Sequence, residues 1–252
     1  METAQRRAGI LRLLEQSESI TVADLVEQLG VSEATVRRDL VRLDQEGVLR
    51  RTHGGARRIA LRGVATPFFA RSAVNHDAKV RIAAAAADMV TSGESVILDS
   101  GTTCLEVARQ LRVSDVRVMP LSLRSAAVLG ELPDLRLTMC GGDIRPHELS
   151  YSGALAVSSI ARMRFDTAIM SCCGFSFREG LTSYDAEDAA VKAAAIRYSA
   201  RAILLCDESK WGRTTFGWAA DASQLTTIIT DHTPTDAERA EAHQHGVEVI
   251  TV

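Results

Sequence analysis

The first 58 residues carry the hydrophobic periodicity of short helices. Apolar residues at positions 10, 11, 13 and 14 form one stripe of a helix. Further on, Thr21 is placed as an N-cap, Asp24 at the third helical position completes a capping box, and Gly30 is a residue type that ends helices. The pattern predicts a short helix between Thr21 and Gly30.

The same arrangement repeats at once in "VSEATVRRDL", residues 31–40. Ser32 is the expected cap of a longer helix that runs to about Glu46 and is closed by Gly47. Two capped helices joined by a glycine turn, of which the second is the longer, are typical of a helix-turn-helix.

From about residue 77 onwards, apolar runs that resemble buried strands alternate with helical stretches. The expected strands are 95–98, 116–119, 135–139, 167–170, 202–205, 226–229 and 247–250. The expected helices are 78–90, 103–111, 123–130, 153–163, 185–199 and 235–245. Such alternation predicts a mainly parallel sheet covered on both faces. We therefore expect an α/β protein with a small N-terminal helix-turn-helix domain at 1–58, a linker at 59–76 and an α/β domain at 77–252.

The second helix has two distinct faces on a helical wheel. Val36, Leu40 and Leu43 fall within one narrow arc, which is the expected buried side. The opposite side, flanked by Thr35 and Arg37, carries small, polar and cationic residues: Ala34, Arg38, Val41, Arg42 and Gln45. That outward face suits the major groove of DNA, where a helix has to approach base edges. An ordinary solvated helix face is the alternative.

The segment after this helix is strongly basic. Residues 48–76 contain six arginines and no aspartate or glutamate. Within them, "VLRRTHGGARR" has the pattern of a two-stranded wing that turns at Gly54–Gly55. A basic hairpin beside a helix-turn-helix can bind backbone phosphates, which favours DNA binding over a solvated helix face. Asp39 departs from the basic trend, and we expect it to hold an arginine or a helix end rather than read a base.

Composition narrows the class of protein without changing this picture. The chain has 252 residues, is 46 % hydrophobic and 24 % charged, and carries a net charge of −3, which leaves room only for a local basic patch. The five cysteines show neither metal-binding spacing nor a disulfide framework, and no apolar stretch resembles a signal peptide or a membrane span. We expect a soluble protein of the cytoplasm with no membrane partner, no metal and no cofactor.

A candidate ligand site lies in "ILDSGTTCLEVA", residues 97–108, where an expected strand runs into an expected helix. The turn places hydroxyls and backbone N–H groups at the N-terminus of that helix, on Asp99, Ser100, Gly101, Thr102 and Thr103. Such a helix N-terminus suits a phosphate group. An ordinary turn between a strand and a helix is the alternative.

Polar or glycine-rich motifs follow three other expected strands. They contain Gly141 and Arg145, then Gly174, and then Asp207 and Lys210. In open α/β sheets, ligands bind beyond the carboxyl ends of the strands, and these motifs share that edge. Lys210 could neutralise a phosphate, and Arg145 could bind one through two parallel hydrogen bonds.

The N-terminal motifs resemble those of a known family. "VSEATVRRDLVRLDQEGVLRRTHGGA" is similar to the N-terminal signature of the DeoR family of bacterial transcriptional regulators, in which a winged helix-turn-helix precedes a sugar-phosphate-sensing domain. The residues that the resemblance implies face the operator are Ser32, Thr35, Arg37 and Arg38. It also implies that the wing carrying Arg51 and His53 contacts the DNA backbone.

The rest of the chain resembles the sensor domain of the same family, whose fold is like that of ribose-5-phosphate isomerase. The shared motifs are "PFFAR", "NHDAKVRIAAAAADMV", "LDSGTT", "GGDIR", "GLT", "DESKWG" and "GVEVITV". The resemblance implies that a phosphorylated sugar or polyol binds near Asp99–Thr103, with Arg145 and Lys210 as further candidates. The chain departs from many relatives at Pro120-Leu121-Ser122, where they carry Thr-Asn-Ser, so an amide that could bind a hydroxyl or phosphate is absent.

These patterns predict a sequence-specific DNA-binding regulator, a repressor of a carbohydrate-utilisation operon that a phosphorylated sugar or polyol releases. One winged helix makes few contacts, so we expect a homo-oligomer, a dimer or tetramer, on a repeated operator in double-stranded DNA. An architectural DNA binder without a ligand would not need the strand-end motifs.

The alternative from another class is a sugar-phosphate isomerase with an added DNA-binding domain. The isomerases that the fold resembles carry Asp-Gly-Ala-Asp at the relevant strand end. This chain has Ser171-Cys172-Cys173-Gly174 there, which offers no carboxylate as a general base. We therefore expect no catalytic residues and no enzyme activity.

Overall fold

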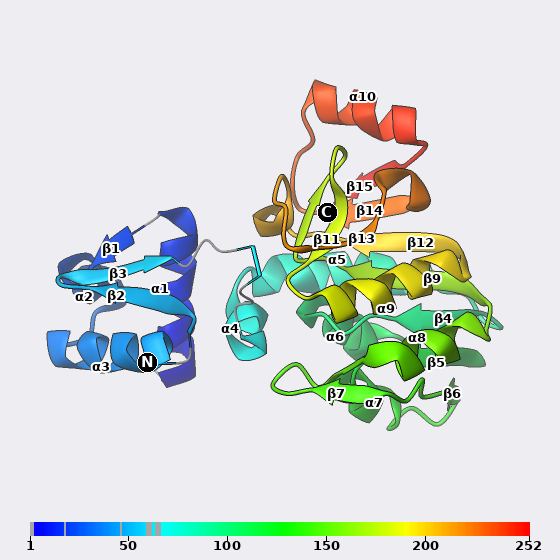
Figure 1. Cartoon of the computed structure of the whole chain (residues 1–252), viewed down its shortest axis with the longest axis horizontal. Helices are drawn as coiled ribbons and strands as arrows, with labels where there is room; N and C mark the ends of the chain where they lie inside the picture. Colours follow the sequence, from blue (N-terminus) through cyan, green and yellow to red (C-terminus); the bar gives the residue numbers. More distant parts are fainter. Residues whose placement is uncertain (1–2, 18, 46, 59–61, 64–66) are drawn as a thin grey trace. The chain divides into compact units, whose positions relative to one another are not determined.

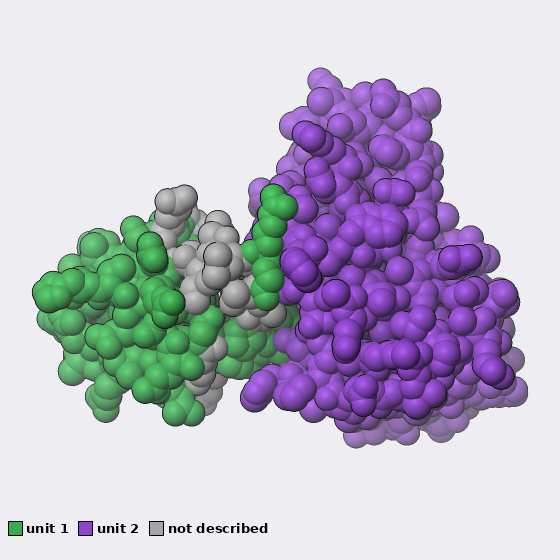
Figure 2. Space-filling model, viewed as in Figure 1, with its two compact units in different colours: residues 1–76 green, residues 77–252 purple. Residues whose placement is uncertain are grey.

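The computed structural model describes the chain except for residues 1–2, 18, 46, 59–61 and 64–66 (Figure 1). The chain divides into two compact units, residues 1–76 and 77–252 (Figure 2). Each unit has a hydrophobic core of its own.

The N-terminal unit combines helices with a small antiparallel sheet. Its helices are α1 (Thr3–Gln16), α2 (Val22–Leu29), α3 (Glu33–Gln45) and α4 (Phe68–Ala73). Its strands, in the sheet order β1-β3-β2, are β1 (Ser19–Thr21), β3 (Gly55–Arg58) and β2 (Leu49–Thr52). The helix pair α2–α3 followed by the hairpin β2–β3 is a winged helix-turn-helix, as the sequence predicts.

Local capping explains why α2 lies where it does. The Thr21 hydroxyl accepts a hydrogen bond from the Asp24 N–H at 3.1 Å, and the Asp24 carboxylate accepts one from the Thr21 N–H at 3.2 Å. Gly30 ends the helix in the left-handed conformation, with φ at 63°. The predicted capping box and glycine stop are therefore confirmed.

The predicted buried face of α3 is confirmed as well. Val36, Leu40 and Leu43 are almost inaccessible to solvent and share a core with Ile10 and Leu25. Burial of this apolar stripe holds α3 against α1 and α2 and leaves its other face outward.

The wing differs from the prediction at its tip. His53 and Gly54 form the turn, because Gly55 is already the first residue of β3 and pairs with both Thr52 and Thr21. A Cβ at Gly55 would lie 2.0 Å from the carbonyl oxygen of Ile20. The glycine is needed for the close approach of β1, a strand that the sequence did not predict, rather than for the turn.

Part of the predicted linker is a helix. Phe68 and Ala70 of α4 are buried, and Ala70 belongs to the core of the N-terminal unit. These apolar residues prefer packing to solvent, so the segment folds onto the unit instead of remaining extended. Residues 59–61 and 64–66 of the predicted linker lie outside the described residues.

The C-terminal unit is built on a seven-stranded, entirely parallel sheet. Its order is β15-β14-β12-β9-β4-β5-β6. The strands are β4 (Ser95–Leu98), β5 (Val116–Pro120), β6 (Leu135–Leu137), β9 (Phe165–Ser171), β12 (Ser199–Leu205), β14 (Thr227–Thr230) and β15 (Glu248–Thr251). All seven apolar runs that the sequence marks as strands are members of this sheet.

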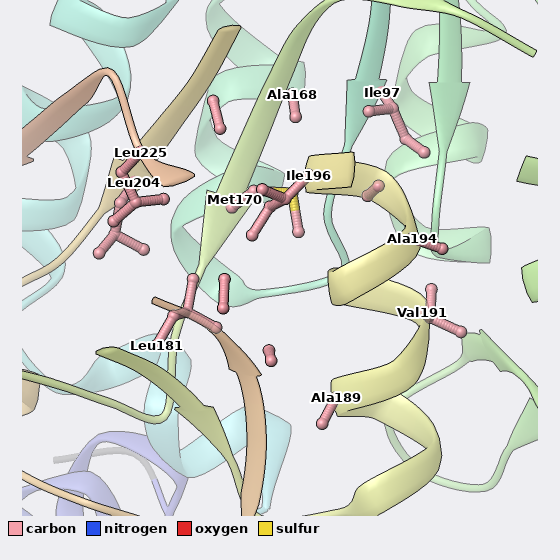
Figure 3. Close-up of a cluster of buried hydrophobic side chains, with 14 of the residues drawn as sticks. Ile97, Ala168, Met170, Leu181, Ala189, Val191, Ala194, Ile196, Leu204 and Leu225 are labelled. Atoms are coloured by element: carbon pink, nitrogen blue, oxygen red, sulfur yellow. The ribbon is translucent and has the colours of Figure 1, made fainter. Parts of the chain in front are cut away.

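Helices cover both faces of the sheet. They are α5 (His76–Asp88), α6 (Thr102–Gln110), α7 (Leu123–Leu129), α8 (Gly153–Ala161), α9 (Ala186–Arg197) and α10 (Asp236–His245). Side chains alternate along each strand, so Ile97 packs under α8 and α9 while Val96 and Leu98 pack under α5 and α6. Figure 3 shows the first of these cores, with Ala189, Val191, Ala194 and Ile196 on α9.

Smaller elements complete the unit. The strands β7 (Asp143–Arg145) and β8 (Ser150–Ser152) form a hairpin. A second, three-stranded antiparallel sheet contains β10 (Gly174–Ser176), β11 (Gly180–Ser183) and β13 (Gly217–Ala220). Short 3-10 turns, η1 (Glu208–Lys210) and η2 (Ala222–Gln224), follow β12 and β13.

The strand order reverses between β4 and β9. From β4 the chain moves through β5 to β6 at one edge, whereas from β9 it moves through β12 and β14 to β15 at the other. The crevice beyond the carboxyl ends of two strands at such a switch point is where open α/β sheets bind ligands. Residues 99–103 follow β4, and Ser171 ends β9.

Gly55→Ala is expected to destabilise the N-terminal unit by about 1–3 kcal/mol, because the added Cβ meets the Ile20 carbonyl. Gly54→Ala is the matched control: its Cβ would meet nothing within 4 Å, so the change should stay within about 0.5 kcal/mol. Both tryptophans, Trp211 and Trp218, lie in the C-terminal unit. Urea unfolding followed by circular dichroism should separate the variants, whereas tryptophan fluorescence should not; equal dichroism midpoints would contradict the close approach.

Candidate functional site

The outward face of α3 presents the residues predicted to meet DNA. Ser32, Arg37, Arg38 and Arg42 are exposed, and Thr35 is half-buried. Three contacts of these side chains lie on the surface of the helix. The Ser32 and Thr35 hydroxyls lie 2.9 Å apart, Arg37 Nε donates to Glu33 at 2.8 Å, and Arg38 Nε donates to the Ala34 carbonyl at 3.3 Å.

The wing is attached to the end of the same helix. Arg51 and His53 are exposed, and the backbone N–H of Arg51 donates to the Asp44 carboxylate at 3.2 Å. This bond fixes the start of the hairpin relative to α3 while leaving both side chains in solvent.

Asp39 holds arginines, as the sequence interpretation expects. Its side chain is buried, at 3 % relative exposure, and accepts hydrogen bonds from Arg6 Nε at 2.5 Å and Arg7 Nε at 3.3 Å. The hydrogen bond to Asp39 raises the pKa of Arg6 above its ordinary value. Both arginines come from α1, so this ion cluster ties α1 to α3.

In the C-terminal unit, α6 begins at the switch point. Gly101 is its N-cap and supplies no side chain to satisfy the N–H groups of the first turn. Ser100, Thr102 and Thr103 are buried, yet none of their hydroxyls hydrogen-bonds to another residue in the part of the chain that the structure describes. Donors and hydroxyls therefore gather at one helix N-terminus.

Asp99 serves the structure beneath this turn. Its buried carboxylate accepts hydrogen bonds from the Ser171 N–H at 2.9 Å and the Ser171 hydroxyl at 2.5 Å, and from the Lys192 ammonium. A Cβ at Gly101 would lie 2.1 Å from Ser171 Oγ, so the turn can pass β9 only with glycine there. Asp99 and Gly101 thus join β4 to β9.

The Lys192 ammonium is the centre of a buried charge network. It contacts Asp99, donates to the Ser171 carbonyl at 3.2 Å and lies 3.6 Å from the Asp188 carboxylate, with 3 % of its side chain exposed. Burial alone would lower the pKa of Lys192, but Asp188 and Asp99 outweigh it and raise the pKa above its ordinary value. Lys192 is therefore held as a cation.

Arg145 joins this network from the hairpin β7–β8. Its Nη1 donates to Asp188 at 3.0 Å, and Asp188 also accepts from the Ser183 hydroxyl at 2.6 Å. The guanidinium predicted to chelate a phosphate is thus engaged in an ion pair that ties the hairpin to α9.

The other strand-end residues have separate surroundings. Gly141 has a positive φ of 73° and open space around it, whereas a Cβ at Gly174 would lie 2.5 Å from the Arg213 carbonyl oxygen. Asp207 is buried and caps η1, accepting from the Ser209 N–H at 3.1 Å. Lys210 is half-buried and forms no ion pair with any residue that the structure describes.

Sequence reasoning missed Lys192, Asp188 and Ser171 as parts of the site. Lys192 is one of only three lysines among 29 basic residues, which was a signal, but nothing local linked it to Asp99. Asp188 stands near the start of α9, where acidic residues are common, so its position in the sequence gave no distinguishing signal. The partners lie on different elements, so spacing along the chain could not reveal them.

The Lys210 turn is held to α10 by Glu238. The Glu238 carboxylate accepts from Trp211 Nε1 at 2.5 Å and from the Thr235 N–H at 2.7 Å, and it lies 3.2 Å from His232 Nε2. Partial burial would raise the pKa of Glu238, but these hydrogen bonds together lower it to about 2.

Two thiols meet beyond β9 and β12. Cys172 and Cys206 follow the paired residues Ser171 and Leu205, and the Cys206 thiol donates to the Asp207 carbonyl at 3.8 Å. The neighbouring Cys172 thiol and burial raise the pKa of Cys206 well above its ordinary value, which disfavours a reactive thiolate.

The described ranges contain neither a metal-binding cluster nor a membrane-spanning helix. No group of three or more histidine, cysteine or carboxylate side chains there could hold a metal ion. Within the same ranges, no helix has both the length and the apolar character needed to cross a membrane.

Both units match models of known domain families. The DeoR-like helix-turn-helix domain matches residues 6–61, and the DeoR C terminal sensor domain matches residues 74–232. The chain is similar to the Glycerol-3-phosphate regulon repressor of Escherichia coli K12, with 31 % identity over 93 % of each chain. It is also similar to the HTH-type transcriptional repressor GlcR of Bacillus subtilis, with 30 % identity over 99 % of this chain and 96 % of the relative.

Among solved structures, ribose 5-phosphate isomerase from Plasmodium falciparum is similar to part of the chain. The identity is 18 %, the aligned region covers 53 % of this chain and 52 % of the isomerase, and the TM-score is 0.40. A likeness at that level says nothing about activity.

Lys192→Met is expected to destabilise the C-terminal unit by about 3–5 kcal/mol, because it leaves Asp99 and Asp188 buried without their cation. Lys210→Met is the matched control and should change stability by no more than about 0.5 kcal/mol. Urea unfolding followed by tryptophan fluorescence measures both. Similar midpoints would show that the buried carboxylates do not depend on Lys192.

Glu238→Gln is expected to cost on the order of 1–3 kcal/mol of unfolding free energy at neutral pH. Because the folded-state pKa of Glu238 lies below the ordinary value of 4.5, its contribution is complete above pH 4.5 and is lost as the pH falls towards 2. The difference between wild type and variant in tryptophan-monitored unfolding should therefore shrink over that range. Glu241→Gln, an exposed position on the same helix, should show no such pH-dependent difference.

Proposed function

Because the chain belongs to the DeoR family of transcriptional regulators and carries both domains of that family, we propose that it represses a carbohydrate-utilisation operon and leaves the operator when a phosphorylated sugar or polyol binds. Family membership makes the chain a DNA-binding regulator of transcription rather than an enzyme. The repressor role is supported by the relatives from Escherichia coli and Bacillus subtilis, both of which are named as repressors.

The outward face of α3 is the part that reads the operator. Arg38 and Arg42 are exposed cations on that face, and Ser32 and Thr35 leave room for the helix N-terminus to approach base edges. Arg37, on the flank, and Arg51 and His53, on the wing, lie where they can reach phosphates. Two or more protomers bind together, as a dimer or tetramer, because one winged unit makes few contacts.

The effector binds at the switch point, on the turn Ser100–Thr103. The observation that carries this assignment is the N-terminus of α6, which no side chain caps, beside the carboxyl ends of β4 and β9. Three hydroxyls there form no hydrogen bond with any residue that the structure describes. A phosphate suits the N–H groups and the helix dipole, and hydroxyls suit the oxygens of a sugar or polyol. Lys210, which forms no ion pair with any described residue, supplies a positive charge beyond β12.

The other predicted site residues support the turn. Asp99 and Arg145 are committed to Lys192 and Asp188, Gly174 packs on Arg213, and Asp207 caps η1. Gly141, with open space around it, can border the ligand. A ligand changes DNA affinity only if it binds two arrangements of the protein unequally, so the effector has to shift elements around this turn. The protein acts in the cytoplasm, where operator and metabolite are both present.

A thermal-shift screen with phosphorylated and free sugars and polyols tests the site. At a hundredfold excess over its dissociation constant, a true effector stabilises the folded state by about 2.7 kcal/mol. Thr102→Asp should abolish this shift, because its carboxylate repels the phosphate, while binding to a mixed-sequence DNA duplex persists. Ser158→Asp, the same charge change at an exposed position on α8, is the control and should keep the shift.

Two outcomes would contradict the proposal. A Thr102→Asp variant that still responds to the same phosphorylated compound would place the effector elsewhere. A wild-type protein that ignores every duplex at low ionic strength would remove the DNA-binding function itself.

A further inference from the structure

Two cysteines occupy adjacent positions beyond the carboxyl ends of β9 and β12. Those strands are parallel neighbours in which Ser171 pairs with Leu205, and the residues that follow this pair are Cys172 and Cys206. Neighbouring strands run about 4.8 Å apart. This spacing falls within the separation of about 4.4–6.8 Å that the Cα atoms of a disulfide usually have.

Both side chains lie on the face of the sheet that α9 covers. Cys206 is a member of the core on that face, and Cys172 packs against the same core. The Cys172 thiol also raises the pKa of Cys206, an effect that requires the two thiols to be close together. Strand position and side-chain direction therefore both allow a bond between the two sulfurs.

The two thiols differ in how far a reagent can reach them. Cys172 is half-buried, whereas Cys206 is buried. A small molecule can therefore react with Cys172 first, while Cys206 can react only with a group that is already attached to Cys172. This is the arrangement of an attacking thiol beside a resolving thiol.

We propose that Cys172 and Cys206 form a reversible disulfide bond when the protein meets a small disulfide such as oxidised glutathione. The Cys172 sulfur loses its proton and attacks the small disulfide, whose S–S bond breaks and releases one thiol that takes up the proton. The Cys206 sulfur then attacks Cys172, and its proton leaves with the second small thiol. Two protein thiols are oxidised, and one small disulfide is reduced to two thiols.

The bond acts on η1, the turn that carries Lys210. Cys206 directly precedes the cap of η1, and Trp211 at the end of η1 packs against the core that contains Cys206. On the other side of the bond, the end of β9 holds the buried Lys192. A disulfide between the two strand ends ties the Lys210 turn to that charge network, so oxidation makes the turn more rigid.

Peptide mapping of the full-length protein tests the bond. The wild type is treated with oxidised glutathione, the remaining thiols are alkylated, and the protein is digested with trypsin. Peptides 165–178 and 202–210, which contain the two thiols, should appear as one linked species that a reducing agent separates. Cys172→Ala should lose the linked species. Cys173→Ala is the matched control, since Cys173 is the adjacent and also half-buried thiol, and should keep it.

Hydrogen exchange measures the effect on the turn. The backbone N–H groups of residues 208–212 should exchange more slowly in the oxidised wild type, and in oxidised Cys173→Ala, than in the same proteins after reduction. Cys172→Ala treated with oxidised glutathione should exchange as fast as its reduced form.

Three outcomes would contradict the inference. A bond between Cys172 and Cys173, or a glutathione adduct that persists without linked peptides, would show that Cys206 is not the partner. Linked peptides with unchanged exchange at 208–212 would remove the effect on the turn. Neither measurement needs DNA or an effector, so a failure of the proposed function would leave both results unaffected.

Discussion

A buried ammonium group constrains the carboxyl ends of β4 and β9, the two strands at which the strand order reverses. Lys192 lies in α9 with 3 % of its side chain exposed, where an uncompensated charge would cost several kcal/mol. Asp99 beyond β4, Asp188 on α9 and the carbonyl of Ser171 on β9 meet that charge. Because the buried Lys192 needs these partners, β4, β9 and α9 keep fixed relative positions at the point where the strand order reverses.

At the proposed effector site, this constraint assigns some residues to holding the structure and leaves others to contact the ligand. Asp99 and Arg145, two charged residues predicted to line the ligand site, are engaged with Lys192 and Asp188 and therefore stiffen the site. The groups left for a ligand are uncharged hydroxyls and N–H donors at the start of α6, together with Lys210. A rigid base under a polar turn keeps the donors in place, which lowers the entropy lost on binding.

In the N-terminal unit, too, a buried charge is compensated by opposite charges from another element. Asp39 is buried beside the core of α3 and has to be matched by cations, and Arg6 and Arg7 of α1 supply them. The ion cluster thereby fixes α1 against the helix that is proposed to face the DNA.

Local patterns in the sequence determined the seven strands, the helices between them, the caps of α2 and the buried stripe of α3. Periodicity and capping act over a few residues, so they can be read from neighbours in the chain. The same patterns placed the turn Ser100–Thr103 at a strand end.

Only the tertiary structure decided which charges compensate each other: Lys192 and Asp99 are 93 residues apart, and Arg6 and Asp39 are 33 apart. It likewise brought β1 against Gly55 and folded α4 onto α1, because contacts between distant segments leave no local periodicity.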